Sequence, residues 1–217
     1  MLLGRILDTF GVSTVLDVGA NEGGFAEELR ASGFGGRIVS FEPASEPYAL
    51  LGEKIARRGD LLWERHQLAL GDEDGTGGLH VYSQQQFNSL HTPSPFGRSN
   101  HGELSETAPV ESVELRRLDG LWEPLSLGSG VFLKVDTQGH DMKVLAGVGR
   151  RVSDVCAIQV ELAVHAIYDD VPPLHVGLEQ LQALGFRPVG FFPIGRHADG
   201  IRVTEFDVLL VRDAGAA

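Results

Sequence analysis

An acidic residue near the end of the first predicted strand comes just before a glycine-rich turn. Asp17 lies near the end of the apolar run 13–18, and Gly19-Ala20-Asn21-Glu22-Gly23-Gly24 comes next. Glycines between a strand and a helix let the backbone approach a ligand closely. A dinucleotide-binding turn reads G-x-G-x-x-G, but Asn21 stands at its second glycine and Asp17 would repel a pyrophosphate. This turn therefore favours a cationic amino-acid group over phosphates.

A second acid, Glu42, follows the next predicted strand, 37–41. An acid at this point accepts hydrogen bonds from both ribose hydroxyls of a nucleotide-like cofactor. Together, Asp17 and Glu42 indicate an adenosine that carries an ammonium or a sulfonium in place of phosphates. An ordinary turn followed by a surface acid is the alternative.

Further polar residues cluster around two later predicted strands. Lys134 and Asp136 share one face because side chains alternate along a strand, and Glu161 ends the next strand. His140 begins the helix after Asp136, and His165 follows Glu161 by four positions. Parallel sheets bind ligands outside the carboxyl ends of their strands. We therefore expect these side chains to meet in one crevice.

Several motifs, taken in order, resemble the FkbM family of S-adenosylmethionine-dependent methyltransferases. They are VLDVGANEGGFAEEL, IVSFEP, ALGD, NSL and FLKVDTQGHDMKVLAGV, from about Val15 to Gly147, with the terminal FDVLLV. The D-x-G turn occurs in methyltransferases in general, whereas the K-V-D-x-x-G-H-D block is more particular to this family. Gln138 departs from the family pattern, which usually has an acid there.

The resemblance implies a set of contacts to S-adenosylmethionine. Asp17 would organise the glycine loop or receive the ammonium through water. Glu42 would bind the ribose, and Pro43 would shape the adenine pocket. The other implied contacts are Gly19, Ala20, Asn21 and Gly23 at the methionine part, Ala69 and Leu70 at the adenine, and Asn88 and Ser89 near the active site.

Methyl transfer to a hydroxyl is an in-line displacement in which the oxygen needs a base. Asp136 or His140 is the candidate, and a histidine ordinarily titrates near neutral pH. Lys134, Glu161 and His165 are then candidate substrate contacts. A divalent metal that acidifies a substrate diol is less favoured, because the sequence has no H-x-x-x-H motif on one helix. Its ligands would be Asp136, Glu161 and His165.

Strand-like runs alternate with helical patterns, which predicts a parallel sheet with helices on both faces. The resemblance implies a doubly wound, Rossmann-like α/β fold of seven mostly parallel strands, the last antiparallel. We expect residues 1–217 to form a single methyltransferase domain. The predicted strands are 13–18, 37–41, one within 61–70, 131–135, 155–161, 186–192 and 206–211; helices are expected from about Gly24 to Gly33, from a cap at Ser45, through 143–147 and along the leucines that precede Gly185.

The middle of the chain differs from the rest. Residues 71–109 are rich in Gly, Ser, Gln, Asn, His and Pro, and only Leu79–Tyr82 looks like a strand. A long polar stretch inside a compact domain is often functional, so we predict a lid on the acceptor side. The alternating run Val110–Leu115 predicts an exposed or edge strand.

The net charge, hydropathy and cysteine content indicate which kinds of partner and which compartment to expect. Eighteen Lys and Arg against 30 Asp and Glu give a net charge of −12, which repels polyanions, so we expect no nucleic-acid partner. No apolar run approaches the length of a membrane span, so we expect no membrane partner. The single cysteine, Cys156, and the absence of a secretory signal indicate a cytoplasmic protein.

The expected function is O-methyl transfer to a small molecule, with a sugar or polyketide-like natural product as the acceptor class that the family suggests. A nicotinamide-dependent oxidoreductase would share the glycine turn and the ribose acid, but Asp17 and the missing second glycine speak against it. A non-catalytic cofactor-binding module would lose the block around Asp136, which is intact here.

Overall fold

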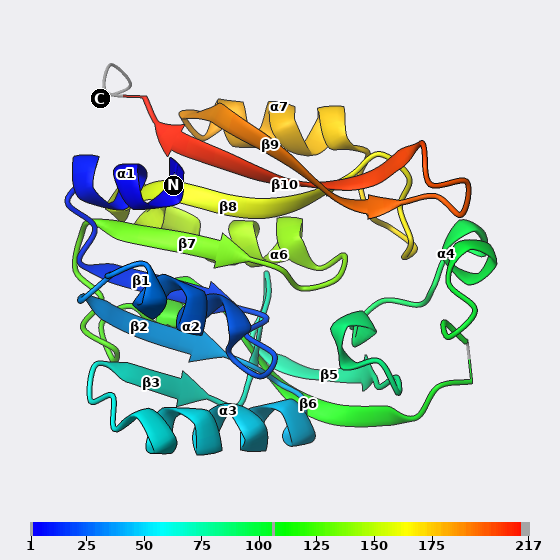
Figure 1. The fold of residues 1–217 in the computed structure, drawn as a ribbon, viewed down its shortest axis with the longest axis horizontal. Helices are drawn as coiled ribbons and strands as arrows, with labels where there is room; N and C mark the ends of the chain where they lie inside the picture. Colours follow the sequence, from blue (N-terminus) through cyan, green and yellow to red (C-terminus); the bar gives the residue numbers. More distant parts are fainter. Residues whose placement is uncertain (1, 106, 214–217) are drawn as a thin grey trace.

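A seven-stranded sheet forms the centre of the molecule (Figure 1), in a computed structural model that describes residues 2–105 and 107–213. Its strand order is β3-β2-β1-β7-β8-β10-β9. Strands β3, β2, β1, β7 and β8 are parallel, and β10 is antiparallel to both its neighbours. The predicted sheet with an antiparallel last strand is confirmed. The strands are β1 (Thr14–Val18), β2 (Arg37–Phe41), β3 (Trp63–His66), β7 (Val131–Val135), β8 (Val155–Ala163), β9 (Phe186–Arg196) and β10 (Val203–Arg212).

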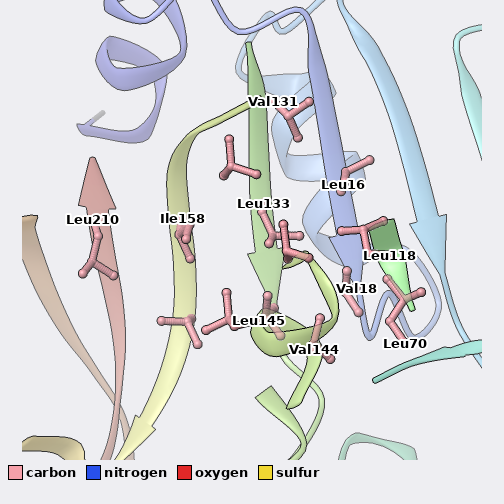
Figure 2. Packing of buried hydrophobic residues seen from close by; sticks show 14 of the residues in the cluster. Leu16, Val18, Leu70, Leu118, Val131, Leu133, Val144, Leu145, Ile158 and Leu210 are labelled. Atoms are coloured by element: carbon pink, nitrogen blue, oxygen red, sulfur yellow. The ribbon is translucent and has the colours of Figure 1, made fainter. Parts of the chain in front are cut away.

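The central strands β1 and β7 are buried on both faces and are apolar at successive positions, whereas most of β9 is exposed. Leu16 and Leu133 belong to one hydrophobic cluster and their neighbours Val15 and Phe132 to another. Figure 2 shows part of the first cluster, in which Leu16, Leu133 and Ile158 lie beside one another on β1, β7 and β8.

Helices pack on each of the two faces. The first cluster includes side chains of α5 (Leu118–Leu121), α6 (Asp141–Gly147) and α7 (Leu174–Ala183). The second includes side chains of α1 (Leu2–Thr9), α2 (Gly24–Ala31) and α3 (Ser45–Arg58). A 3-10 helix, η2 (Gly149–Asp154), leads from α6 to β8. In the described part of the chain, no helix has the length and apolarity needed to cross a membrane.

Two local predictions need correction. Helix α3 begins at Ser45, so its cap is Ala44 rather than Ser45, whose side chain contacts Glu111 instead. The run predicted as an exposed or edge strand is β6 (Val110–Arg116), which is exposed on one face but is the middle strand of a separate sheet of order β4-β6-β5. The alternating pattern reports one buried face, here with Val113 and Leu115, and carries no information on how many strands pair with it.

The polar segment 71–109 folds into short elements instead of an irregular loop. After β4 (Ala69–Leu70) it forms β5 (Gly75–His80), η1 (Gln85–Phe87) and α4 (Pro95–Asn100). Ser94 caps α4, and Gly97 packs so closely on Ile167 that a side chain there would collide with the Ile167 main chain. The segment is therefore packed against the loop that follows β8. Its role as a lid stays a prediction.

Candidate active site

A cavity of about 370 Å³ opens where the parallel strands end. One wall comes from the residues that follow β1, β2, β7 and β8, and another from the segment 85–101. Parallel sheets of this type bind their ligands at this edge. The sequence-predicted residues that line it are Gly19, Asn21, Glu42, Pro43, Ala69, Leu70, Asn88, Asp136, His140 and Glu161.

The other predicted residues lie outside that wall. Ala20 and Lys134 line a second, more open hollow that shares Gly19, Asn21 and Asp136 with the cavity. Asp17 and Ser89 are buried behind the surface. The roles of all these residues stay predictions.

The glycine turn is tied to the strand beside it. The backbone N–H groups of Gly19 and Ala20 both donate to the Phe41 carbonyl at 3.0 Å. A side chain at Gly19 would collide with the main-chain oxygen of Asp136, so this position requires close backbone approach. At Gly23, φ is 81°, and a side chain would strike Leu51 and Trp63. Both glycines are thus demanded by the packing of the loop.

Glu42 is almost fully buried beneath this turn, at 6% exposure. Its Oε2 accepts a hydrogen bond from the Asn21 N–H at 2.7 Å, and its Oε1 accepts one from the Ala44 N–H at 2.9 Å. Burial raises the pKa of Glu42 to about 7, because desolvation outweighs these two hydrogen bonds. Each oxygen keeps a lone pair for a further donor.

Lys134 neutralises two carboxylates from neighbouring strands. Its Nζ lies 3.1 Å from Oδ1 of Asp17 and 3.2 Å from Oδ2 of Asp136, and it donates to the Gly19 carbonyl at 3.2 Å. Burial opposes the charge on Lys134, but Asp136 and Asp17 together outweigh it and raise the pKa of the ammonium. Lys134 is therefore an internal counter-ion that holds the glycine turn and Asp136 together.

Asp136, Gln138 and Glu161 form a hydrogen-bonded group in the cavity. The Gln138 amide nitrogen donates to Asp136 Oδ1 at 3.2 Å and to Glu161 Oε2 at 3.0 Å. Burial, followed by the negative charge of Asp136, raises the pKa of Glu161 well above its usual range. The sequence marked Gln138 only as a departure from a motif, and the contact with Glu161 depends on the pairing of β7 with β8.

His140 pairs with a histidine of the polar segment, which by its composition suits either hydrogen bonds to a polyol or a solvated loop. Its Nδ1 lies 3.0 Å from Nε2 of His91, which belongs to the polar segment. His140 is 5% exposed, and burial, with His91 and Lys143 adding to the effect, lowers its pKa to about 4. The expectation that His140 titrates near neutral pH is therefore wrong, because the buried ring loses its hydration when charged. No sequence signal pairs residues 91 and 140.

The sequence comparison identifies the family of this chain. A model of the methyltransferase FkbM domain matches residues 17–188. The chain belongs to this family. The resemblance seen in the motifs is confirmed. This FkbM domain is 29% identical over 145 residues to Methyltransferase 1 of Beauveria bassiana (strain ARSEF 2860), with 63% of this chain and 58% of that protein covered.

Two solved structures share its fold. Methyltransferase FkbM from Methylobacillus flagellatus KT superposes with a TM-score of 0.57 at 16% identity, covering 92% of this chain and 43% of that one. Magnesium protoporphyrin IX methyltransferase (ChlM) from Synechocystis PCC 6803, solved with bound S-adenosylmethionine, gives a TM-score of 0.53 at 10% identity, covering 98% and 76%. The Rossmann-like methyltransferase fold is thus confirmed. The chain spans 58% of the curated relative and 43% of the FkbM structure.

The FkbM domain has polar groups suited to S-adenosylmethionine. Asn21 Oδ1, Asn88 Nδ2 and Thr137 Oγ1 are buried and have no hydrogen-bond partner among the described residues, and all three residues line the cavity. Buried polar atoms ordinarily have partners, so such atoms at a cavity suit a polar ligand. Glu42 would meet the ribose, and the Gly19 turn would leave room for the amino-acid part. The residues present fit the cofactor that the family uses.

Asp136, Glu161 and His165 do not come together as a metal site. His165 is absent from the cavity lining, and its ring packs against Phe96 with centroids 5.4 Å apart. Asp136 and Glu161 meet Gln138 instead. Among residues 2–105 and 107–213, no group of three or more His, Cys, Asp or Glu side chains is arranged to hold a metal ion.

A further acid, Glu205 of the last strand, lines the cavity near Gln138 and Glu161; we call this part of the lining the outer wall. Glu205 on β10 lines it beside Glu161, and burial, followed by Asp141 and Asp136, raises the pKa of Glu205 to about 7. No lysine or arginine of the described chain is among the lining residues. The sequence alone does not indicate Glu205, because only the sheet order brings β10 next to β8.

Proposed function

We propose that this FkbM domain transfers a methyl group from S-adenosylmethionine to a hydroxyl of a small molecule, a sugar or a polyketide-like natural product. The observation that carries the proposal is one continuous cavity that runs from Glu42 to Asp136 and on to Glu161. The cavity brings together Glu42, which would bind the ribose, Asp136 as a candidate base, and a polar outer wall. S-adenosylmethionine, when bound, supplies a methyl carbon activated by its positive sulfur.

The cofactor end of the cavity follows from Glu42 and its surroundings. The Glu42 carboxylate has lone pairs left for two ribose hydroxyls, and Asn21 and Ala44 hold its orientation. Apolar side chains, among them Phe41 and Leu70, line the same part of the cavity and suit a flat base. These contacts position a ligand without doing chemistry on it.

Asp136 is the better candidate for the base. Lys134 and Gln138 each contact one of its oxygens, so the carboxylate is held in one orientation at the cavity wall. Burial lowers the pKa of His140 to about 4, so it has no advantage over a carboxylate as a proton acceptor, and its Nδ1 already faces His91. We assign proton acceptance from the acceptor hydroxyl to Asp136, and a supporting role to His140.

The outer wall suits hydroxyl donors and disfavours anions. Glu161, Glu205 and Gln138 present hydrogen-bond acceptors there, and no lysine or arginine from the described residues lines the cavity. A phosphorylated acceptor would meet carboxyl groups without a cation. The net charge of −12 extends this argument to nucleic acids. The single cysteine agrees with a reducing, cytoplasmic location, which we also propose.

The test is methyl transfer from labelled S-adenosylmethionine to a panel of sugars, glycosylated intermediates and polyketide-like alcohols. Neutral hydroxyl acceptors should be methylated, and Asp136→Asn should lose most of the rate. Calorimetry with S-adenosylhomocysteine, NAD and NADP separates the cofactor classes, and only the first should bind. Transfer to a nitrogen or carbon acceptor would overturn the hydroxyl assignment, and binding of NAD alone would overturn the cofactor.

A further inference from the structure

Gln138 has a backbone conformation that side chains rarely adopt. Its φ is 52°, and the next residue, Gly139, has a φ of 96°. The buried carboxylate of Asp141 fixes this turn by accepting N–H bonds from Thr137 at 3.2 Å and from Gly139 at 3.1 Å. A left-handed residue that its surroundings hold in place is typical of functional sites. The turn directs the Gln138 side chain back toward Asp136.

The Gln138 amide lies between two carboxyl groups. An amide nitrogen carries two hydrogens, and here one neighbour is Asp136 Oδ1 and the other is Glu161 Oε2. The second Asp136 oxygen, Oδ2, faces Lys134 at 3.2 Å. Asp136 is therefore held from both sides, by a cation on one oxygen and by an amide on the other.

The same residue connects Asp136 to the polar segment. Ser89 Oγ donates to the Gln138 carbonyl at 2.6 Å. The Tyr168 hydroxyl lies between the Phe87 carbonyl, at 2.7 Å, and Gln138 Oε1, at 3.4 Å. A shift of residues 87–89 would thus reach Asp136 through Gln138.

We propose that Gln138 is a positioning residue: its amide separates Asp136 from Glu161 and orients the Asp136 carboxylate toward the acceptor hydroxyl. This inference rests on the proposed function, in which Asp136 takes the proton. A glutamate in the same place would have no hydrogen to donate when ionised. It would add a charge beside two carboxyl groups, while Lys134 is already shared with Asp17. The amide supplies donors without adding charge.

The experiment compares two substitutions of similar shape, Gln138→Met and Gln138→Glu. Both remove the amide donors, but only the second introduces a group that can regain one by protonation. Gln138→Met should lower the single-turnover rate by about 10- to 100-fold at all pH values, because a misplaced base loses its alignment. Gln138→Glu should be slower still at pH 8 and should recover as the pH falls. The titratable groups around it are Lys134, Asp136, Asp141, Glu161, Tyr168 and Glu205, with Asp207 farther along the sheet.

Affinity for S-adenosylhomocysteine and the melting temperature report whether each variant is folded, and both should stay near wild type. Gln67→Met is the matched control, since Gln67 donates to Ser45 Oγ outside the cavity, and its rate should stay within about twofold of wild type. Crystal structures should show Asp136 displaced in the Gln138 variants and unmoved in the control. The series uses any acceptor that the wild type methylates, so a nitrogen acceptor would overturn only the proposed function. A wild-type rate in Gln138→Met, or identical pH profiles for both variants, would overturn the role of Gln138.

Discussion

The Asn21 backbone N–H donates to Glu42 Oε2 across 2.7 Å, which joins the glycine turn of one strand to the acid of the next. Glu42 is therefore already oriented before any ligand arrives. Its raised pKa of about 7 means that the cofactor-free protein carries this group partly protonated at neutral pH. Cofactor affinity should therefore depend both on Glu42 and on the pH.

Replacing Glu42 should greatly weaken binding of the cofactor product. Each charge-assisted hydrogen bond to the ribose contributes about 1.5–3 kcal/mol, so Glu42→Ala should cost about 100-fold or more in S-adenosylhomocysteine affinity by calorimetry. The wild-type affinity should rise as the pH increases from 5.5 to 8, because the ionised carboxylate is the better acceptor. In Glu42→Ala the affinity should change less with pH. Equal binding by the variant and the wild type would refute the ribose assignment.

The segment 71–109 should be the first site of limited proteolysis. It supplies part of the cavity wall, including Phe87, Asn88 and Leu90, and its helices, η1 and α4, are only three and six residues long. Bound cofactor and acceptor together should slow cleavage there, as followed by mass spectrometry of the fragments. The β7–α6 region serves as an internal reference that should stay intact. First cuts elsewhere, or no protection by ligands, would count against a lid.

The chemical step should depend strongly on Asp136 and less on His140. Removing a general base costs about 10²–10⁴-fold in rate, and we expect Asp136→Asn in that range under single turnover. His140→Ala should slow transfer less than Asp136→Asn does, without weakening S-adenosylhomocysteine binding.

The pH profile and a chelator test the same two residues. Since the pKa of His140 is about 4, its loss should leave no change in the profile near pH 6.5. Neither chelator nor added Mg²⁺ should change the methyl-transfer rate of the wild type or of His140→Ala. A large loss of rate on addition of chelator would instead support a divalent metal held by Asp136, Glu161 and His165.

The carboxyl groups with raised pKa values should make the cofactor-free protein less stable as the pH rises. In the folded state Glu42, Asp141 and Glu205 keep their protons to about pH 7, whereas unfolded carboxyls lose theirs near pH 4. The folded state binds more protons in this window, so the free energy of unfolding falls as the pH rises through it.

Urea unfolding at pH 6.5 and pH 8 measures this effect. The midpoint should be lower at pH 8, and Glu205→Gln should reduce the difference, since it removes one of the titrating groups. Gln67→Glu, which places a carboxyl outside the cavity, should leave the difference as it is. A wild-type midpoint that rises toward pH 8 would contradict the shifts.

Much of the fold and part of the site could be predicted from the sequence, because both depend on local patterns. Apolar runs of strand length, separated by helical patterns, indicate a parallel sheet. In such a sheet, acids and glycines that follow the strands must meet at one edge. For that reason Glu42, Gly19 and Asp136 could be expected at one cavity, and they line it.

Only the tertiary structure decided which side chains touch. Gln138 reaches Glu161 across 23 positions, and His91 reaches His140 across 49. The order of the strands, with β10 inserted between β8 and β9, adds Glu205 to the cavity, and β6 gains partners on both sides. Such contacts are set by packing between segments far apart in the chain, and the hydropathy of each segment says nothing about its neighbour. The same packing removes water from His140 and Glu42, and this loss of hydration moves their pKa values away from those of the free side chains.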